Sequence, residues 1–349
     1  MALRGGRVVH LFQRFKSFAK WILLPVQPPG PVWDTPRLHR YPGYTPDDLW
    51  VFDRFRDIPR QAEPGFLKDY LGVRTRPGSL AEINRPLAGH LQDLPVPGDW
   101  HAEAIEHIGL LKSVLAAKGS YHAMELGAGW GPWLISGAVA AQHIGIQDIH
   151  LLGVEADTGH FAFLLQHFKD NGFNPDQHLL LHAAVGAQAG MARFPRVKDP
   201  ANQWGARPSM QDGQSGNAAD QAYLSDLMTA GQAKPGHPTP EPELEEVPVV
   251  AINDLLRKSD RWDLVHIDVQ GWEMAICSAG LEEMNRRVRY LVVGTHSRKL
   301  DGDLVELFHR AGWQLEHEKP TQFSYTRKME QLENMTVGDG TQVWRNPRV

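Results

Sequence analysis

The spacing of apolar residues changes near residue 101. From there, short apolar runs of strand length alternate with longer stretches whose apolar residues recur at helical spacing. This alternation predicts βαβ units, right-handed crossovers and a mostly parallel sheet in an α/β domain. The predicted strands are 121–126, 149–156, 178–185, 263–269 and 289–296, and the predicted helices are 102–119, 158–172, 273–288 and 303–313.

The C-terminal part adds two strands to this pattern. The first is 313–319, and the second, 340–347, is expected to return antiparallel and close the sheet edge. Together these segments define a main domain over residues 101–349.

Two other regions lack the alternation. Residues 25–100 are rich in proline and aromatic residues and contain only short helical patterns, which predicts an irregular head or cap, called the head below. Residues 198–247 consist mainly of Gly, Pro, Ser, Gln and Asn and end in an acidic run. A structureless segment of this length inside a domain predicts a lid-like or disordered insert.

The first 24 residues carry five basic residues and no acidic one, threaded among apolar residues. The longest clean apolar run there, 21–26, is too short for a signal peptide or a membrane span, so we expect a cytoplasmic protein. Residues 1–24 are a candidate amphipathic helix for peripheral contact with the inner membrane surface. The alternative is a helix that packs on its own domain or on a partner.

Composition narrows the classes of protein. Apolar residues make up 42% and charged residues 22%, which is typical of a globular protein. The net charge is −5 although the N-terminus is basic, so the body is acidic and we expect no nucleic-acid partner. The single cysteine, Cys277, excludes an intramolecular disulfide and a multi-cysteine zinc site.

The first strand of the main domain ends in the turn ELGAGWG, residues 125–131. A phosphate-binding P-loop needs a Gly-Lys pair, which the chain lacks, and a dinucleotide fingerprint would place its third glycine at Pro132. The remaining ExGxGxG pattern, with an acid at the strand end, suits S-adenosylmethionine better than a pyrophosphate. The candidate cofactor-binding residues of this turn are Glu125, Gly127, Ala128, Gly129 and Gly131.

The next two strands add further candidates. Glu155, followed by Ala156, ends the second strand, where a carboxylate can accept hydrogen bonds from ribose hydroxyls in dinucleotide and S-adenosylmethionine folds alike. Asp157 is better explained as a helix N-cap. Ala183 and Ala184 end the third strand, where small side chains suit either an adenine ring or simple close packing.

The candidate catalytic residues lie at the ends of the fourth and fifth predicted strands. Asp268 follows a buried apolar run and is a candidate for both catalysis and cofactor binding, because an unpaired buried carboxylate is costly. If the two strands are adjacent, His296 lies beside it and can accept a proton from a hydroxyl. His266 is interpreted as a satisfied core histidine and Glu273 as a complement to a helix dipole. A divalent cation at Asp268, His296 and a further acid is a minority hypothesis, so no metal is expected.

Several segments resemble the FkbM-type S-adenosylmethionine-dependent methyltransferases over roughly residues 100–320. They are ELGAGWG, LLGVEAD, HAAVG, VVAINDLL, LVHIDVQGWE and VVGTHS. The resemblance implies a Rossmann-like, doubly wound, seven-stranded class I methyltransferase domain that binds S-adenosylmethionine. It also implies O-methylation of a hydroxyl on a sugar, polysaccharide, glycolipid or related natural product, with the family's aspartate at Asp268. Gln270 and Gly294 stand where many members have acids, which moves the expected base to His296.

Two other functions stay open at this point. One is a catalytically silent Rossmann-like binding module, and the other is an NAD-dependent sugar oxidoreductase, which Pro132 disfavours. The acceptor is expected to be a small molecule or a glycan, with Trp204 and Tyr223 of the insert as candidate aromatic faces for a sugar. The sequence does not indicate an oligomeric state.

Overall fold

The computed structural model describes residues 43–206, 209–210, 243–325 and 335–349. The chain divides into two compact units, 1–41 and 42–349, and the description that follows concerns the second. The predicted helix at 1–24 and most of the predicted insert lie outside the described residues. Among the residues described, no helix combines the length and apolar character needed to cross a bilayer.

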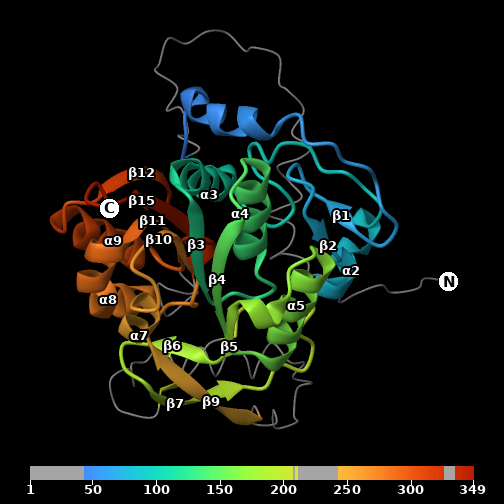
Figure 1. The fold of residues 1–349 in the computed structure, drawn as a ribbon. Helices are drawn as coiled ribbons and strands as arrows, with labels where there is room; N and C mark the ends of the chain where they lie inside the picture. Colours follow the sequence, from blue (N-terminus) through green and yellow to red (C-terminus); the bar gives the residue numbers. More distant parts are fainter. Residues whose placement is uncertain (1–42, 207–208, 211–242, 326–334) are drawn as a thin grey trace, which may run out of the picture. The chain divides into compact units, whose positions relative to one another are not determined.

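A seven-stranded sheet forms the centre of the unit (Figure 1). In spatial order its strands are β12 (Gln314–Lys319), β15 (Gly340–Arg345), β11 (Val288–Thr295), β10 (Trp262–Ile267), β3 (Ser120–Leu126), β4 (Asp148–Glu155) and β5 (Leu179–His182). The five strands from β11 to β5 are parallel, and β15 runs antiparallel to both of its neighbours. The predicted doubly wound, mostly parallel sheet is therefore confirmed.

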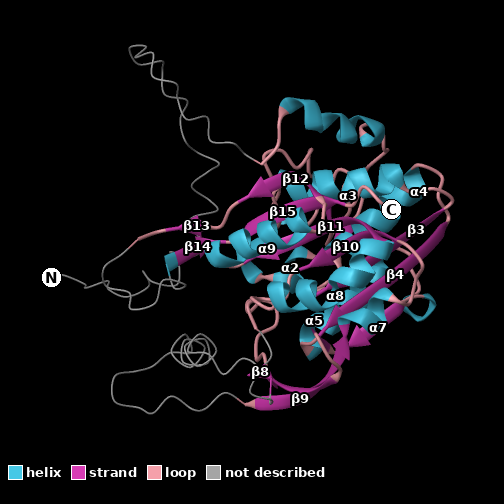
Figure 2. Cartoon of the chain, turned by 90° about the vertical axis from the view of Figure 1, so that its left-hand side faces the viewer, coloured by secondary structure: helices cyan, strands magenta, loops and turns pink. Residues whose placement is uncertain are grey.

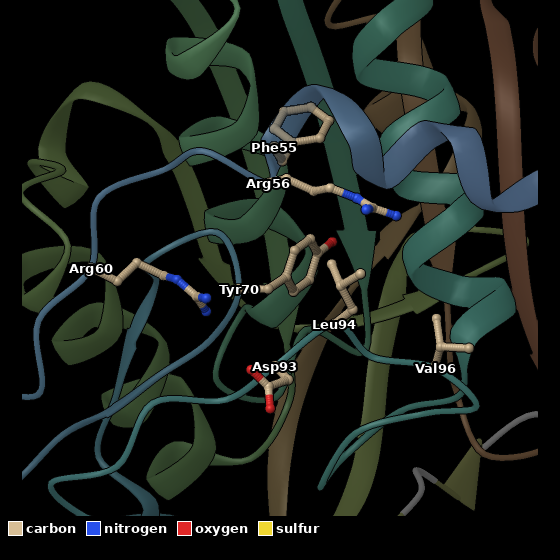
Figure 3. A pocket seen from close by; sticks show the side chains of 7 residues that line it. All are labelled: Phe55, Arg56, Arg60, Tyr70, Asp93, Leu94 and Val96. Carbon is tan, nitrogen blue, oxygen red and sulfur yellow. The ribbon is translucent and has the colours of Figure 1, made fainter.

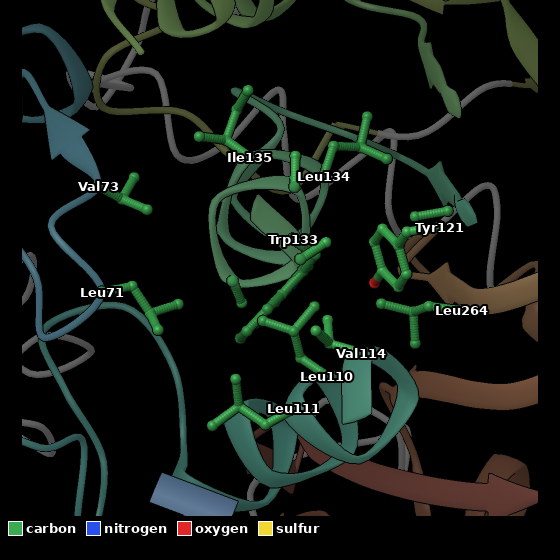
Figure 4. Packing of buried hydrophobic residues seen from close by; sticks show 14 of the residues in the cluster. Leu71, Val73, Leu110, Leu111, Val114, Tyr121, Trp133, Leu134, Ile135 and Leu264 are labelled. Carbon is green, nitrogen blue, oxygen red and sulfur yellow. The ribbon is translucent and has the colours of Figure 1, made fainter. Parts of the chain in front are cut away.

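Helices cover both faces of this sheet, α3 and α4 on one and α8 and α9 on the other (Figure 2). The helices of the main domain are α3 (Ala104–Ala116), α4 (Pro132–His143), α5 (Thr158–Asp170), α7 (Ile252–Leu256), α8 (Glu273–Arg287) and α9 (Arg298–Arg310). Alternate residues of a strand serve opposite faces. Leu264 joins the core beneath α3 and α4 (Figure 4), whereas its neighbour Val265 joins the core beneath α7, α8 and α9.

The head packs on the first of these cores. Its described part contains η1 (Pro46–Phe55), β1 (Leu67–Lys68), β2 (Arg74–Thr75), α2 (Pro77–Leu80) and η2 (Glu82–Leu87). Phe52, Phe55 and Leu71 are at most 1% exposed and belong to the same hydrophobic cluster as α3 and α4. The head thus adds apolar cover beside the helices that lead into and out of β3.

The predicted third strand is split between two sheets. Only β5 joins the main sheet, and β6 (Ala184–Gly186) pairs with β9 (Leu244–Ala251) in a four-stranded sheet that also contains β7 (Gly190–Pro195) and β8 (Ser209–Met210). The insert predicted over 198–247 is therefore wrong at its end, where β9 begins. Acidic residues and Pro248 hid the strand, although Val247 and Val249 are buried at alternate positions.

The position predicted for the last strand is also wrong. β15 is antiparallel as expected, but it lies between β11 and β12, and β12 forms the edge. The burial of the two strands explains the order. β15 is buried along almost its whole length, whereas the more polar β12 is largely accessible, which suits an edge strand.

Candidate active site

The turns that follow β3 and β10 lie side by side, because these two strands are parallel neighbours from which the chain winds outward in opposite directions. Such a switch point is where open α/β sheets bind their ligands. The amide of Asp268 donates to the carbonyl of Leu126 over 2.9 Å. A Cβ atom at Gly127 would lie 1.8 Å from the carbonyl oxygen of Asp268, so only glycine allows this approach.

We call residues 127–131 the glycine turn. Gly127, Gly129 and Gly131 all have positive φ angles, of 73°, 55° and 72°, which favour glycine. A Cβ atom at Gly131 would lie 2.3 Å from Leu164 of α5, so this glycine also permits close helix packing. Gly131 then leads into α4, whose first residue is Pro132.

Glu155, at the end of β4, holds the glycine turn in place. Its Oε2 accepts a hydrogen bond from the amide of Gly129 and its Oε1 accepts one from the amide of Asp157, both over 2.8 Å. Glu155 is 7% exposed, and burial raises the pKa of its carboxyl group to about 7. Asp157 caps α5 by accepting a hydrogen bond from the amide of His160, which confirms its predicted role.

The remaining cofactor candidates point into the protein. The Glu125 carboxylate accepts a hydrogen bond from the amide of Leu134 over 3.0 Å, at the start of α4, and burial raises its pKa well above the usual value. Ala128, Ala183 and Ala184 are at most 4% exposed and lie in three different hydrophobic clusters. Ala156 packs against the cluster of the four-stranded sheet.

An aromatic group lies over the glycine turn. Trp204 stacks on His160 with ring centroids 4.0 Å apart and meets Trp130 edge-on at 5.0 Å. Its ring would be 3.4 Å from a Cβ atom at Gly129. Trp204 therefore contributes an aromatic face beside the turn, whereas Tyr223 lies outside the described residues.

Asp268 and His296 meet as expected, because β10 and β11 are adjacent parallel strands. His296 Nε2 lies 3.2 Å from Asp268 Oδ1, and His296 Nδ1 lies 3.0 Å from Glu273 Oε1. Glu273 is fully buried and accepts hydrogen bonds from the amides of Val269 and Gly271. We call Asp268, Glu273 and His296 the reaction triad.

The contact between Glu273 and His296 was not predicted from the sequence. Glu273 does begin α8, as its assignment to the helix dipole required, but it also ties the imidazole to the turn after β10. The available signal was an acid five residues after Asp268, on the first turn of a helix whose apolar residues are buried. His266 is 4% exposed and packs against Trp133, which confirms its core position, but neither ring nitrogen has an aligned hydrogen bond to a described residue, so it is not the satisfied histidine that was predicted.

Within the reaction triad, His296 and Asp268 stabilise each other's charged forms. Burial lowers the pKa of His296, but contact with Asp268 and Glu273 outweighs it and raises the pKa well above the usual value. The pKa of Asp268 is lowered, because contacts with His296 and Gln270 outweigh its burial. At neutral pH the His296 imidazole therefore carries a second proton and faces the ionised carboxylate of Asp268.

The two departures from the family pattern have local explanations. Gln270 Nε2 donates to Asp268 Oδ1 over 2.8 Å and so supplies a neutral donor beside the carboxylate. At Gly294, a Cβ atom would lie 3.2 Å from Asp268 Cγ, which leaves little room for a larger side chain. Both residues thus fit the observed position of Asp268.

A cavity of about 340 Å³ lies in another part of the unit (Figure 3). It is lined by Phe55, Arg56, Arg60, Tyr70, Asp93, Leu94 and Val96. None of the site residues predicted from the sequence is among these lining residues.

Comparison with known proteins identifies the family. No family model matches the chain. A protein named "Putative methyltransferase" from Jannaschia sp. (strain CCS1) is 31% identical over 286 residues, which cover 82% of this chain and 94% of that protein.

Two solved structures show lower similarity. Methyltransferase FkbM from Methylobacillus flagellatus KT matches with a TM-score of 0.36 and 12% identity, over 66% of this chain and 45% of that one. The C-terminal domain of precorrin-6Y C5,15-methyltransferase from Rhodobacter capsulatus matches with a TM-score of 0.35 and 11% identity, over 71% and 91%. On the relationship to the Jannaschia protein, the chain belongs to a methyltransferase family.

Proposed function

We propose that the chain is an S-adenosylmethionine-dependent O-methyltransferase of the FkbM type, acting on a hydroxyl of a sugar, polysaccharide, glycolipid or related natural product. The observation that carries the proposal is the reaction triad at the sheet's switch point, directly beside the glycine turn. A partly exposed carboxylate, fixed by a half-buried imidazole, suits the removal of a proton from a hydroxyl.

The residues of the glycine turn fit this cofactor. Glu155 is a buried carboxylate whose pKa is raised to about 7, so it gains from any further hydrogen-bond donor, and a ribose supplies two hydroxyls. The amide of Gly129 donates to this carboxylate, and Trp204 offers an aromatic face beside Gly129. When bound, S-adenosylmethionine supplies an electrophilic methyl group on a sulfonium.

Within the reaction triad, Asp268 is the group that an acceptor can reach. Its side chain is 41% exposed, compared with 16% for His296 and none for Glu273. His296 already holds a proton at neutral pH, so we assign the acceptance of the hydroxyl proton to Asp268 and a positioning role to His296 and Glu273. A carboxylate suffices, because the hydroxyl becomes strongly acidic as its oxygen bonds to the methyl carbon.

The pH dependence of methyl transfer separates these roles. If Asp268 accepts the proton, kcat at saturating S-adenosylmethionine, where the titration of Glu155 in the free enzyme no longer contributes, should stay flat from neutrality down to about pH 5, because the pKa of Asp268 lies below the usual value of about 3.9. If His296 were the base, its raised pKa would make the rate climb with pH through and above neutrality. A climbing profile that disappears in His296→Gln would return the proton-accepting role to His296.

Binding and activity are tested separately. Calorimetric titration with S-adenosylhomocysteine should give micromolar binding that is lost in Glu155→Ala and kept in Glu282→Ala, an exposed control. NAD should not bind. If S-adenosylhomocysteine binds but labelled S-adenosylmethionine transfers no methyl group to any glycan or lipid extract, the silent binding module replaces this proposal.

A further inference from the structure

A second cluster of histidines and acid lies away from the reaction triad, where the head joins α3. It consists of Asp99, His101 and His107, called the loop–helix cluster below. Asp99 Oδ1 accepts hydrogen bonds from the amides of His101 and Ala102, over 2.8 and 2.9 Å. This tight turn fixes the carboxylate so that Oδ2 lies toward His107, on the first part of α3.

The donor atoms of the loop–helix cluster converge. His101 Nδ1 lies 2.8 Å from Asp99 Oδ1, and His107 Nε2 lies 3.2 Å from Asp99 Oδ2. One donor atom from each of the three residues lies within 4.8 Å of the other two. The donor atoms of a four-coordinate zinc site, with bonds of about 2.0–2.1 Å, are separated by similar distances.

These groups are buried without adequate partners. The side chains of Asp99 and His107 are 1% exposed and that of His101 is 13% exposed. Asp99 Oδ2 and all four ring nitrogens lack an aligned hydrogen bond to any described residue. Because buried polar groups are nearly always satisfied, this arrangement indicates that a bound group completes it.

The surroundings favour a cation. Asp69 and Glu106, like Asp99, each act to raise the pKa of the His101 imidazole. Three carboxylates therefore lie around the two imidazoles. Arg60 donates to the backbone carbonyls of Asp69 and Gln92. Among the described residues, the two histidines are the main groups that balance the negative charge of these carboxylates. A positive ion would therefore add to that balance.

We propose that Asp99, His101 and His107 bind a divalent transition-metal ion of the zinc type. Two imidazoles and one carboxylate are a ligand set that such ions prefer, and three protein ligands leave a fourth position for water. This site is independent of the methyl-transfer proposal. It ties the loop before α3 to α3 itself.

The site also reaches the glycine turn through ring contacts. The ring of His107 lies 5.1 Å from that of Trp133, and the ring of His101 lies 5.6 Å from both Trp130 and Trp133. The bound metal would therefore fix the two histidines against which Trp130, within the glycine turn, and Trp133, just after it, pack. On the other side, the ring of Tyr70, which lines the cavity of Figure 3, lies 5.8 Å from that of His107.

The test uses the full chain without a histidine tag, dialysed and then loaded with zinc or cobalt. We expect one metal ion per chain by elemental analysis, visible absorption from bound cobalt, and a melting temperature that chelator lowers. His107→Gln and Asp99→Asn should lose the ion. His150→Ala should keep the ion. His150 pairs with Asp148, so this control has the same kinds of side chain as the loop–helix cluster, but the pair is exposed rather than buried.

The reaction triad is the competing location, since it also brings a histidine and two acids together. An ion retained in His296→Ala and lost in His107→Gln supports the loop–helix cluster. An ion lost in His296→Ala and retained in His107→Gln overturns the proposal. Absence of binding by the wild-type chain at micromolar zinc overturns it too, and circular dichroism of each variant separates loss of a ligand from loss of the fold.

Discussion

The turns after β3 and β10 are neighbours, yet they hold their carboxylates in different ways. At the glycine turn, Glu125 and Glu155 are buried and accept hydrogen bonds from backbone amides. After β10, Asp268 is partly exposed and is held by the side chains of His296 and Gln270. Backbone partners make a rigid cradle, whereas side-chain partners leave one carboxylate accessible and electrostatically tuned. Under the proposed function, this difference assigns cofactor binding to the first turn, after β3, and methyl transfer to the second turn, after β10.

The largest expected effect comes from removing the negative charge of Asp268, in the turn after β10. Asp268→Asn should lower kcat for methyl transfer by roughly 10²–10⁴-fold, because the hydroxyl proton then has no acceptor. Binding of S-adenosylhomocysteine should stay within about threefold of wild type, because the cradle belongs to the other turn. Equal losses of binding and turnover would erase the distinction between the two turns.

The next effect tests how tightly the two turns are joined. Gly127→Ala should lower the free energy of unfolding by more than about 3 kcal/mol, because its Cβ atom would collide with the carbonyl of Asp268 at a φ of 73°. Gly145→Ala is the control, since Gly145 has a φ of 92° but nothing within 4 Å of its added Cβ atom. It should cost only about 1–2 kcal/mol in urea denaturation. Equal costs would show that the close approach contributes nothing.

A smaller effect concerns the buried carboxylate of the first turn. Between about pH 4.5 and 7, folded Glu155 keeps a proton that the unfolded chain has lost, because its pKa is raised to about 7. The contribution of Glu155 to the free energy of unfolding therefore falls as the pH rises through this window, by at most about 3 kcal/mol. Glu155→Gln should show a flatter dependence of unfolding free energy on pH, and the exposed control Glu282→Gln should follow the wild type. A Glu155→Gln curve parallel to wild type would contradict the raised pKa.

The sequence predicted what periodicity and adjacency determine. Apolar runs predicted the parallel strands, and the succession of β10 and β11 brought Asp268 and His296 together. The sequence could not predict groups that meet through tertiary packing. Glu273 reaches His296 only because α8 folds back beneath the turn, and His107 meets Asp99 only because the loop before α3 closes on itself.

Strand order was a second limit. The sequence of β15 predicts a strand but not its position, because insertion between β11 and β12 depends on which of two strands is the more apolar. The pairing of β6 with β9 joins segments separated by residues 187–243, so no local pattern specifies it. For β15 the strand was predicted and its neighbours were not, whereas β9 was missed as a strand as well, because acidic residues and Pro248 interrupt its apolar pattern.

The smallest expected effect isolates the aromatic face of the first turn. Trp204 stacks on His160, and its Nε1 donates to the carbonyls of Leu80 and Ala201. Trp204→Phe keeps an aromatic ring and loses the donor, so it should cost about 0.5–1.5 kcal/mol of stability and little affinity for S-adenosylhomocysteine. Trp204→Ala loses the ring as well and should weaken that affinity by roughly tenfold, or about 1.4 kcal/mol.

Because Trp204 contacts the glycine turn and not the reaction triad, neither variant should change kcat at saturating S-adenosylmethionine. The measurement is therefore the split between KM for the cofactor and kcat. A fall in kcat for Trp204→Ala with an unchanged KM would place this side chain on the acceptor's side of the site, and the assignment of binding to the first turn and reaction to the second would no longer hold.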